Sequence, residues 1–187
     1  QDYDRRFQLV QDAIGTRIDE GLEWLSEKSS EANQAVYDAE KPTKEQMYQA
    51  KLWNTLEKLI TDQFDYLSRS YLLEAIKAKN AIPYIQKHLD AGRKAVVFHN
   101  FNKGGGFHPF KLSNEAKVEL RIDGIIPEDA VYALEQARPD LVNLDLSGLQ
   151  SPTAALSQAF GSRMAMFNGT VPKSERNRNV QLFNQDD

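Results

Sequence analysis

The chain has 187 residues, of which 41% are hydrophobic and 27% are charged, a composition typical of a globular protein and not of a disordered tail. It contains no cysteine, which excludes disulfides, thiolate metal sites and cysteine nucleophiles. The formal net charge of −4 excludes a uniformly basic coat for nucleic acid, although it allows a local basic surface. No apolar run approaches the ~20 residues that cross a bilayer, so we expect a cytoplasmic protein without a membrane span.

The first ninety residues have a helical pattern. Apolar residues recur at three- and four-residue spacing from Phe7 and Val10 to Leu25, which predicts a long amphipathic helix that Gly15 and Gly21 weaken locally. Thr43 and Gln46 have the spacing of a capping box and predict the start of a second helix.

A third helical stretch carries apolar residues from Phe64 to Leu89. Pro83 lies inside this stretch and predicts a kink or a break, because proline removes one backbone hydrogen bond of a helix. Gly92 is placed to end the helix. Residues 1–91 are therefore expected to form a helical lead-in region.

From Gly92 onward the pattern changes. Ala95-Val96-Val97-Phe98 is a continuous apolar run that predicts a strand buried on both faces. Further strands are predicted at residues 141–146 and 163–167, and helices at 127–138, 151–160 and from Pro172 to Asn184. This order predicts an α/β fold with a partial parallel sheet flanked by helices over residues 92–187. Such a sheet would need another strand after Asn184, so we expect the chain to be a fragment of a larger protein.

Two clusters have some features of ligand sites but lack the residues that such sites need. The triplet Gly104-Gly105-Gly106 follows a predicted strand, but no Gly-Lys-Ser or Gly-Lys-Thr comes after it, so we interpret it as a flexible loop. The histidines, His88, His99 and His108, lack metal-ligand spacing and carboxylate or thiolate partners. We therefore expect no metal site, and no complete catalytic constellation is visible.

One segment indicates phosphate binding. The predicted strand ends in Asn168-Gly169-Thr170, and the following helix opens with Lys173, Ser174 and Arg176. Backbone N–H groups, hydroxyls and cations at one place are the groups that hold a phosphate. The alternative is a solvated loop with a routine helix cap, which these residues also satisfy.

Two segments resemble the second RecA-like lobe of superfamily-two helicases, with the Swi/Snf-type and the phage and plasmid Strawberry Notch-like proteins the most similar. The first spans residues 71–99 and includes Ala91-Gly92-Arg93-Lys94 followed by the apolar run, which resembles the strand called motif IV. The second spans residues 163–187 and includes the glycine turn, the helix start Lys173-Ser174-Glu175-Arg176, which resembles the family's Ser-x-x-Arg helix, and a closing Phe183-Asn184. An insertion at about 100–161 separates them.

The resemblance implies a truncated lobe of an ATP-dependent DNA helicase or translocase that grips the backbone of duplex DNA. Its backbone contacts would be Asn100, Gly169, Thr170, Ser174 and Arg176, with Lys173 adding charge beside them. ATP and Mg²⁺ are implied for the complete motor together with a first lobe. The chain has no Walker lysine and no acidic box, so by itself it is not expected to hydrolyse ATP.

Another function stays open at this point. The chain can be a non-catalytic structural or protein-interaction module of a phage or plasmid, with the helices as a docking surface. A self-contained enzyme of another class ranks third, because no nucleophile has a base in a recognisable pattern.

Overall fold

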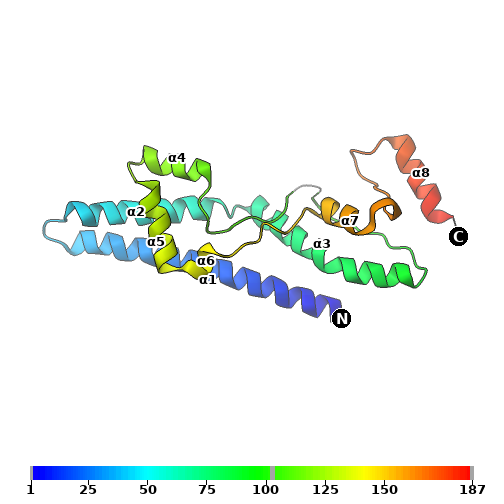
Figure 1. Ribbon diagram of the computed structural model, residues 1–187, viewed down its shortest axis with the longest axis horizontal. Coiled ribbons are helices and arrows are strands. Elements are labelled where there is room, and N and C mark those ends of the chain that lie inside the picture. The colour runs from blue at the N-terminus through cyan, green and yellow to red at the C-terminus, as the bar shows by residue number, and fades with distance from the viewer. Residues whose placement is uncertain (1, 102–103, 186–187) are drawn as a thin grey trace.

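The computed structural model describes residues 2–101 and 104–185, with side chains described from residue 14 onward within these ranges. This part of the chain is all-α and elongated (Figure 1). The helices are α1 (Asp2–Asp38), α2 (Lys44–Asp62), α3 (Tyr66–Asp90), α4 (Asn114–Ile122), α5 (Pro127–Ala137), α6 (Pro139–Val142), α7 (Pro152–Phe160) and α8 (Lys173–Asn184), with a 3₁₀ turn η1 at Gly161–Arg163.

Helices α1 and α2 form a long antiparallel hairpin (Figure 1). Their facing sides meet in a fully buried apolar seam made by Leu25, Leu52, Leu56 and Ile60. The predicted amphipathic stripe of α1 is confirmed from residue 14 onward, and Phe7 and Val10 lie outside the described side chains. Glycine does not interrupt α1, because the seam compensates for its low helix propensity.

The predicted start of α2 is confirmed in detail. The Gln46 backbone N–H donates to the Thr43 hydroxyl at 3.1 Å, and the Thr43 N–H donates to the Gln46 side-chain oxygen at 2.9 Å. Two backbone donors at the helix end are thus satisfied reciprocally, which stabilises the turn between α1 and α2 by about 1 kcal/mol.

Helix α3 is continuous through Pro83, so the predicted break is wrong. Pro83 and Lys79 are both exposed, and water can bind the carbonyl whose intrahelical donor the proline removes. The predicted end at Gly92 is confirmed, and the φ of this glycine is +70°. The Gly92 N–H donates to the Leu89 carbonyl, and the Arg93 N–H donates to the His88 carbonyl. Only glycine adopts this left-handed conformation at low cost.

Helices α4, α5 and α6 cover the hairpin (Figure 1). Phe110, which is 1% exposed, inserts between Gly21 of α1 and Phe64, with 6.1 Å between the two phenyl centroids. The same core includes buried apolar residues from α4 to α6, namely Ala116, Leu120, Ala130, Leu134 and Leu141. The segment predicted as an insertion therefore shares one core with the helical region before it.

The predicted α/β fold with a RecA-like parallel sheet is wrong, because the described residues contain no strand. Residues 93–99 form no helix, turn or ladder, residues 164–167 follow η1 without regular structure, and residues 141–146 run from α6 into a turn. A β-strand is stable only when its backbone pairs with a neighbour, and here helices take the neighbouring positions. The predicted helices at 127–138, 151–160 and up to Asn184 are confirmed.

The glycine triplet serves close packing of two backbones. Gly105 pairs with Gln150 in an isolated antiparallel bridge, and the Gly106 N–H donates to the Leu149 carbonyl at 2.7 Å. A Cβ at Gly106 would lie 1.5 Å from the Leu146 carbonyl oxygen. Glycine is therefore required by this contact and not by flexibility. The preceding Asn102 and Lys103 lie outside the described residues.

Within the ranges described, none of the helices is both long and apolar enough to span a bilayer.

The packing of Phe110 predicts opposite effects for the same substitution at two glycines of α1. A Cβ at Gly21 would lie 2.2 Å from the Phe110 ring, whereas a Cβ at Gly15 would meet nothing within 4 Å. We expect Gly21→Ala to lower the free energy of unfolding by about 1–3 kcal/mol through overpacking. Gly15→Ala, the matched control, should raise it by up to about 1 kcal/mol through helix propensity. Urea unfolding followed by circular dichroism measures both, and equal effects of the two variants would contradict this packing.

Candidate nucleic-acid interface

Charge is strongly segregated in this molecule. Residues 75–101 and 152–185 contain nine lysines and arginines but only two carboxylates, Asp90 and Glu175. The remainder of the chain contains the other fourteen basic residues against twenty-five acidic ones. The two basic stretches comprise most of α3, α7 and α8, which lie together at one end of the molecule (Figure 1). We call this region the basic end.

Eight of the nine cations have no acidic partner within the described part of the chain. Lys94, Arg163 and Arg176 contact carbonyl, amide or aromatic groups instead. The other five are Lys79, Lys87, Arg93, Lys173 and Arg178. All five are exposed. Among the described residues, the one ion pair that a cation of the basic end makes joins Lys77 to the buried carboxylate of Glu74, just outside this region, at 3.0 Å. Unpaired exposed cations keep their full attraction for an external anion, because no internal carboxylate neutralises them.

The predicted phosphate-binding residues 169–176 surround the start of α8. The N–H and hydroxyl of Thr170 both donate to the side-chain oxygen of Asn168, at 2.9 and 2.7 Å, which forms a tight turn beside Gly169. Lys173 and Ser174 follow in the exposed first turn of α8. The helix has no side-chain cap, so its first N–H groups are not satisfied by a cap from within the chain.

Arg176 is held differently from the other cations. Its guanidinium carbon lies 5.7 Å from the centre of the Phe167 ring, a cation–π distance, and its Nε atom is buried without a hydrogen-bond partner. The aromatic ring restricts the arginine side chain and reduces the entropy that it would lose on binding an anion.

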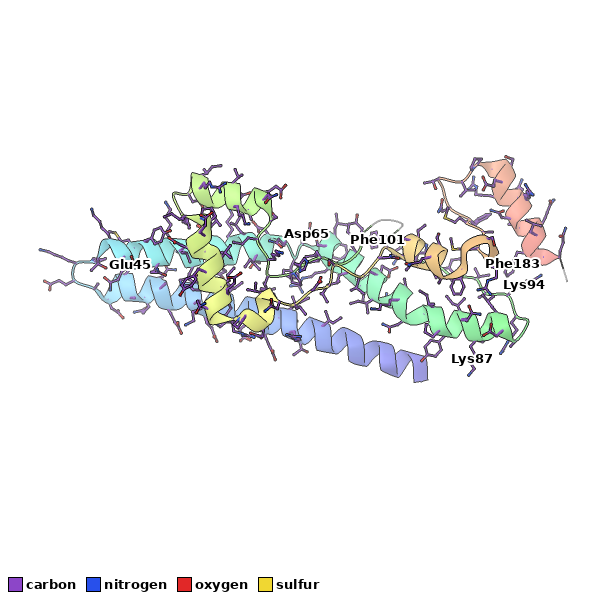
Figure 2. The ribbon with its side chains drawn as sticks, viewed as in Figure 1. Glu45, Asp65, Lys87, Lys94, Phe101 and Phe183 are labelled. Carbon is purple, nitrogen blue, oxygen red and sulfur yellow. The ribbon has the colours of Figure 1, made fainter. Side chains whose placement is uncertain are left out.

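Asn100 does not join these residues. Its backbone N–H donates to the Glu74 carboxylate at 3.2 Å, near the middle of α3. Figure 2 shows its neighbour Phe101 well apart from Phe183, which lies on α8. The structure thus brings together Gly169, Thr170, Lys173, Ser174 and Arg176, which are close in sequence, and leaves Asn100 elsewhere.

Helix α3 and the residues that follow it contribute further cations to the basic end, none of which was among the predicted site residues: Lys79, Lys87, Arg93 and Lys94. Lys94 connects the two basic stretches. Its Nζ donates to the carbonyls of Phe183, at 3.0 Å, and Gln185, and it lies 5.9 Å from the centre of the Phe183 ring (Figure 2). A cation at the C-terminal carbonyls of a helix is favourable, so Lys94 fixes α8 against the end of α3. In the sequence, the pair Arg93-Lys94 directly after the glycine that ends α3 was the pattern that could have indicated this second group of cations.

No catalytic or metal-binding arrangement accompanies these cations in the described ranges. No group of three or more histidine, aspartate or glutamate side chains there could hold a metal ion. The largest pKa shift lies outside the basic end, where hydrogen bonds from Arg138 lower the pKa of Asp140 to about 2. Arg138 also lies 5.7 Å from the centre of the Trp24 ring, so this ion pair supports packing of α6 on α1.

No protein-family model matches the chain, and comparison with curated proteins and with solved structures gives no match either.

The Lys94 contact predicts a local effect on α8. We expect Lys94→Ala to speed hydrogen exchange of the last-turn amides of α8 about two- to fivefold, because the carbonyls lose a stabilising cation. Lys87→Ala, which removes an exposed charge without a partner, is the matched control and should leave these rates unchanged. Hydrogen exchange followed by mass spectrometry measures both variants. Unchanged exchange in Lys94→Ala would show that α8 is held by other contacts.

Proposed function

We propose that this chain binds the phosphate backbone of nucleic acid, without reading its sequence, through the basic end. The observation that carries the proposal is the segregation of charge: nine cations and two carboxylates lie in residues 75–101 and 152–185 of an otherwise acidic chain. Phosphate contacts from lysine and arginine supply nearly all of the affinity of non-specific nucleic-acid binding.

The geometry at α8 supports the same proposal. Lys173 and Arg178 are exposed and have no ion-pair partner among the described residues, and Arg176 is oriented by Phe167. Phosphate oxygens would accept hydrogen bonds from these cations and from the free N–H groups at the start of α8. None of these groups distinguishes one base from another, so binding would be independent of sequence.

The wider role follows from the sequence resemblance alone. In a complete helicase or translocase these contacts would hold DNA while ATP and Mg²⁺ act elsewhere in the motor. The described residues contain no parallel sheet of the kind that such a lobe is built on, so the fold adds nothing to the motor role. Backbone binding depends only on the cations and does not require the sheet.

The alternative function, a protein-interaction module, is favoured by a separate observation. Large apolar side chains are exposed at the basic end, including Phe98 at 91% and Phe167 at 64%. Contiguous exposed apolar residues on a soluble surface are typical of interaction sites.

Loss of two exposed cations of α8 tests the proposal. We expect Lys173→Ala combined with Arg178→Ala to weaken binding of a fluorescein-labelled duplex DNA of arbitrary sequence about tenfold, measured by fluorescence anisotropy. The slope of log affinity against log salt should fall by about 0.9 for each phosphate contact that is lost.

The matched control removes the same charge from α2 through Lys51→Ala combined with Lys58→Ala, and we expect it to leave DNA affinity nearly unchanged. Arg176→Ala is tested separately, because it also removes the contact with Phe167. No measurable binding of DNA or RNA by the unmodified chain at low salt would refute the proposed function. Equal losses in the α8 and α2 pairs would show that the basic end is not the site.

A further inference from the structure

Residues 93–99 form an extended segment that nothing in the described structure pairs with. They have neither helix nor turn nor bend, and follow directly on the glycine that ends α3. The apolar residues are exposed: Val96 by 62%, Val97 by 39% and Phe98 by 91%. Exposing consecutive β-branched and aromatic side chains costs free energy that a covering partner would recover.

The backbone of this segment is also unpaired. Among the described backbone hydrogen bonds, the last donor before it is the Arg93 N–H, and none involves the N–H or carbonyl groups of residues 94–98. Such a row of free donors and acceptors is what an edge strand presents to an incoming strand. Helical or nucleic-acid partners could cover the side chains but would leave these backbone groups unsatisfied.

A groove runs beside the segment. It is lined by residues 94–98 on one side and by Ala81, Tyr84, Ile85 and His88 of α3 on the other. Successive side chains of a strand point to opposite faces, so alternate residues of an added strand would enter this groove. The lining is largely apolar, which favours apolar residues at those alternate positions.

Cations near the groove favour acidic residues at those positions of the added strand that point away from it. Lys94 lines the groove, and Arg93, which directly precedes the segment, is exposed and has no acidic partner in the structure described. Asp90 is the only carboxylate in residues 75–101. A partner with carboxylates would gain from these cations, and a second copy of the basic end would be repelled by them.

We propose that residues 94–98 are a docking site for an extended polypeptide of another protein, which adds a β-strand to this segment. The partner alternates apolar residues, which enter the groove against α3, with glutamate or aspartate, which lie beside Arg93 and Lys94. This proposal can fail or hold separately from nucleic-acid binding, because it also needs free backbone groups and exposed valines that a phosphate backbone does not use.

A synthetic peptide of alternating valine and glutamate, labelled with fluorescein, tests the site. We expect saturable binding to the full chain by fluorescence anisotropy, together with slower hydrogen exchange of the amides of residues 95–98. Val96→Pro should weaken binding by roughly tenfold or more, because it removes one ladder donor and fits a paired strand poorly. Tyr37→Ala removes an aromatic side chain that is 84% exposed at the far end of α1 and should have no effect.

Two further probes separate the possible occupants. The same peptide with alternate backbone nitrogens methylated cannot complete the ladder and should not bind, and a version with lysine in place of glutamate should bind more weakly. Equal binding of the methylated peptide, or no binding of the valine–glutamate peptide, would overturn the proposal. A dimer in sedimentation that Val96→Pro abolishes would assign the segment to a second copy instead. Protection of the amides of residues 95–98 by DNA, with none by the peptide, would assign it to nucleic acid.

Discussion

The apolar seam between α1 and α2 is the contact on which the rest of the structure depends. Leu25, Leu52, Leu56 and Ile60 are excluded from water along it, and each contributes about 1.5–3 kcal/mol relative to exposure. The paired helices then provide the surface that receives Phe110 and, through it, helices α4 to α6. The Phe110 ring can reach the seam because Gly21 has no side chain in its path. Packing of α4 to α6 on the hairpin therefore requires glycine at this position.

Helix α8 has no comparable core, in contrast to α7 at the same end, which buries Leu156 and Phe160. Helix α8 contains no buried residue, and its described attachments are polar: Lys94 at its C-terminal carbonyls and Asn179, whose side chain donates to the Met166 carbonyl at 3.0 Å. Low local stability and functional surfaces tend to occur together, because groups that bind a ligand cannot also be satisfied by internal packing. The molecule thus combines a well-packed hairpin with a loosely held end that carries its unpaired cations and exposed apolar residues.

The two proposed ligands of the basic end are both anionic, so they compete for the same cations. A phosphate backbone needs the cations of α8 and those at the end of α3, whereas an acidic strand needs Arg93 and Lys94 together with the free backbone of residues 94–98. Occupying the shared cations with one ligand reduces the attraction left for the other. If both ligands bind, each should therefore lower the affinity of the other by the same factor.

The sequence by itself determined α1 to α3, α5, α7 and α8, because their signals are local: apolar spacing in α1 to α3, the capping pair of Thr43 and Gln46, and glycine at helix ends. It did not predict α4, and it predicted a strand where α6 ends. It also determined the cations that follow one another at the start of α8. It misled at residues 95–98, because an apolar β-branched run has the composition of a strand whether or not a partner strand is available. Only the tertiary structure decided that helices flank this run, that Phe110 requires Gly21, and that cations of α3 lie at the same end as those of α8. These are contacts between residues far apart in the chain, and no local pattern encodes them.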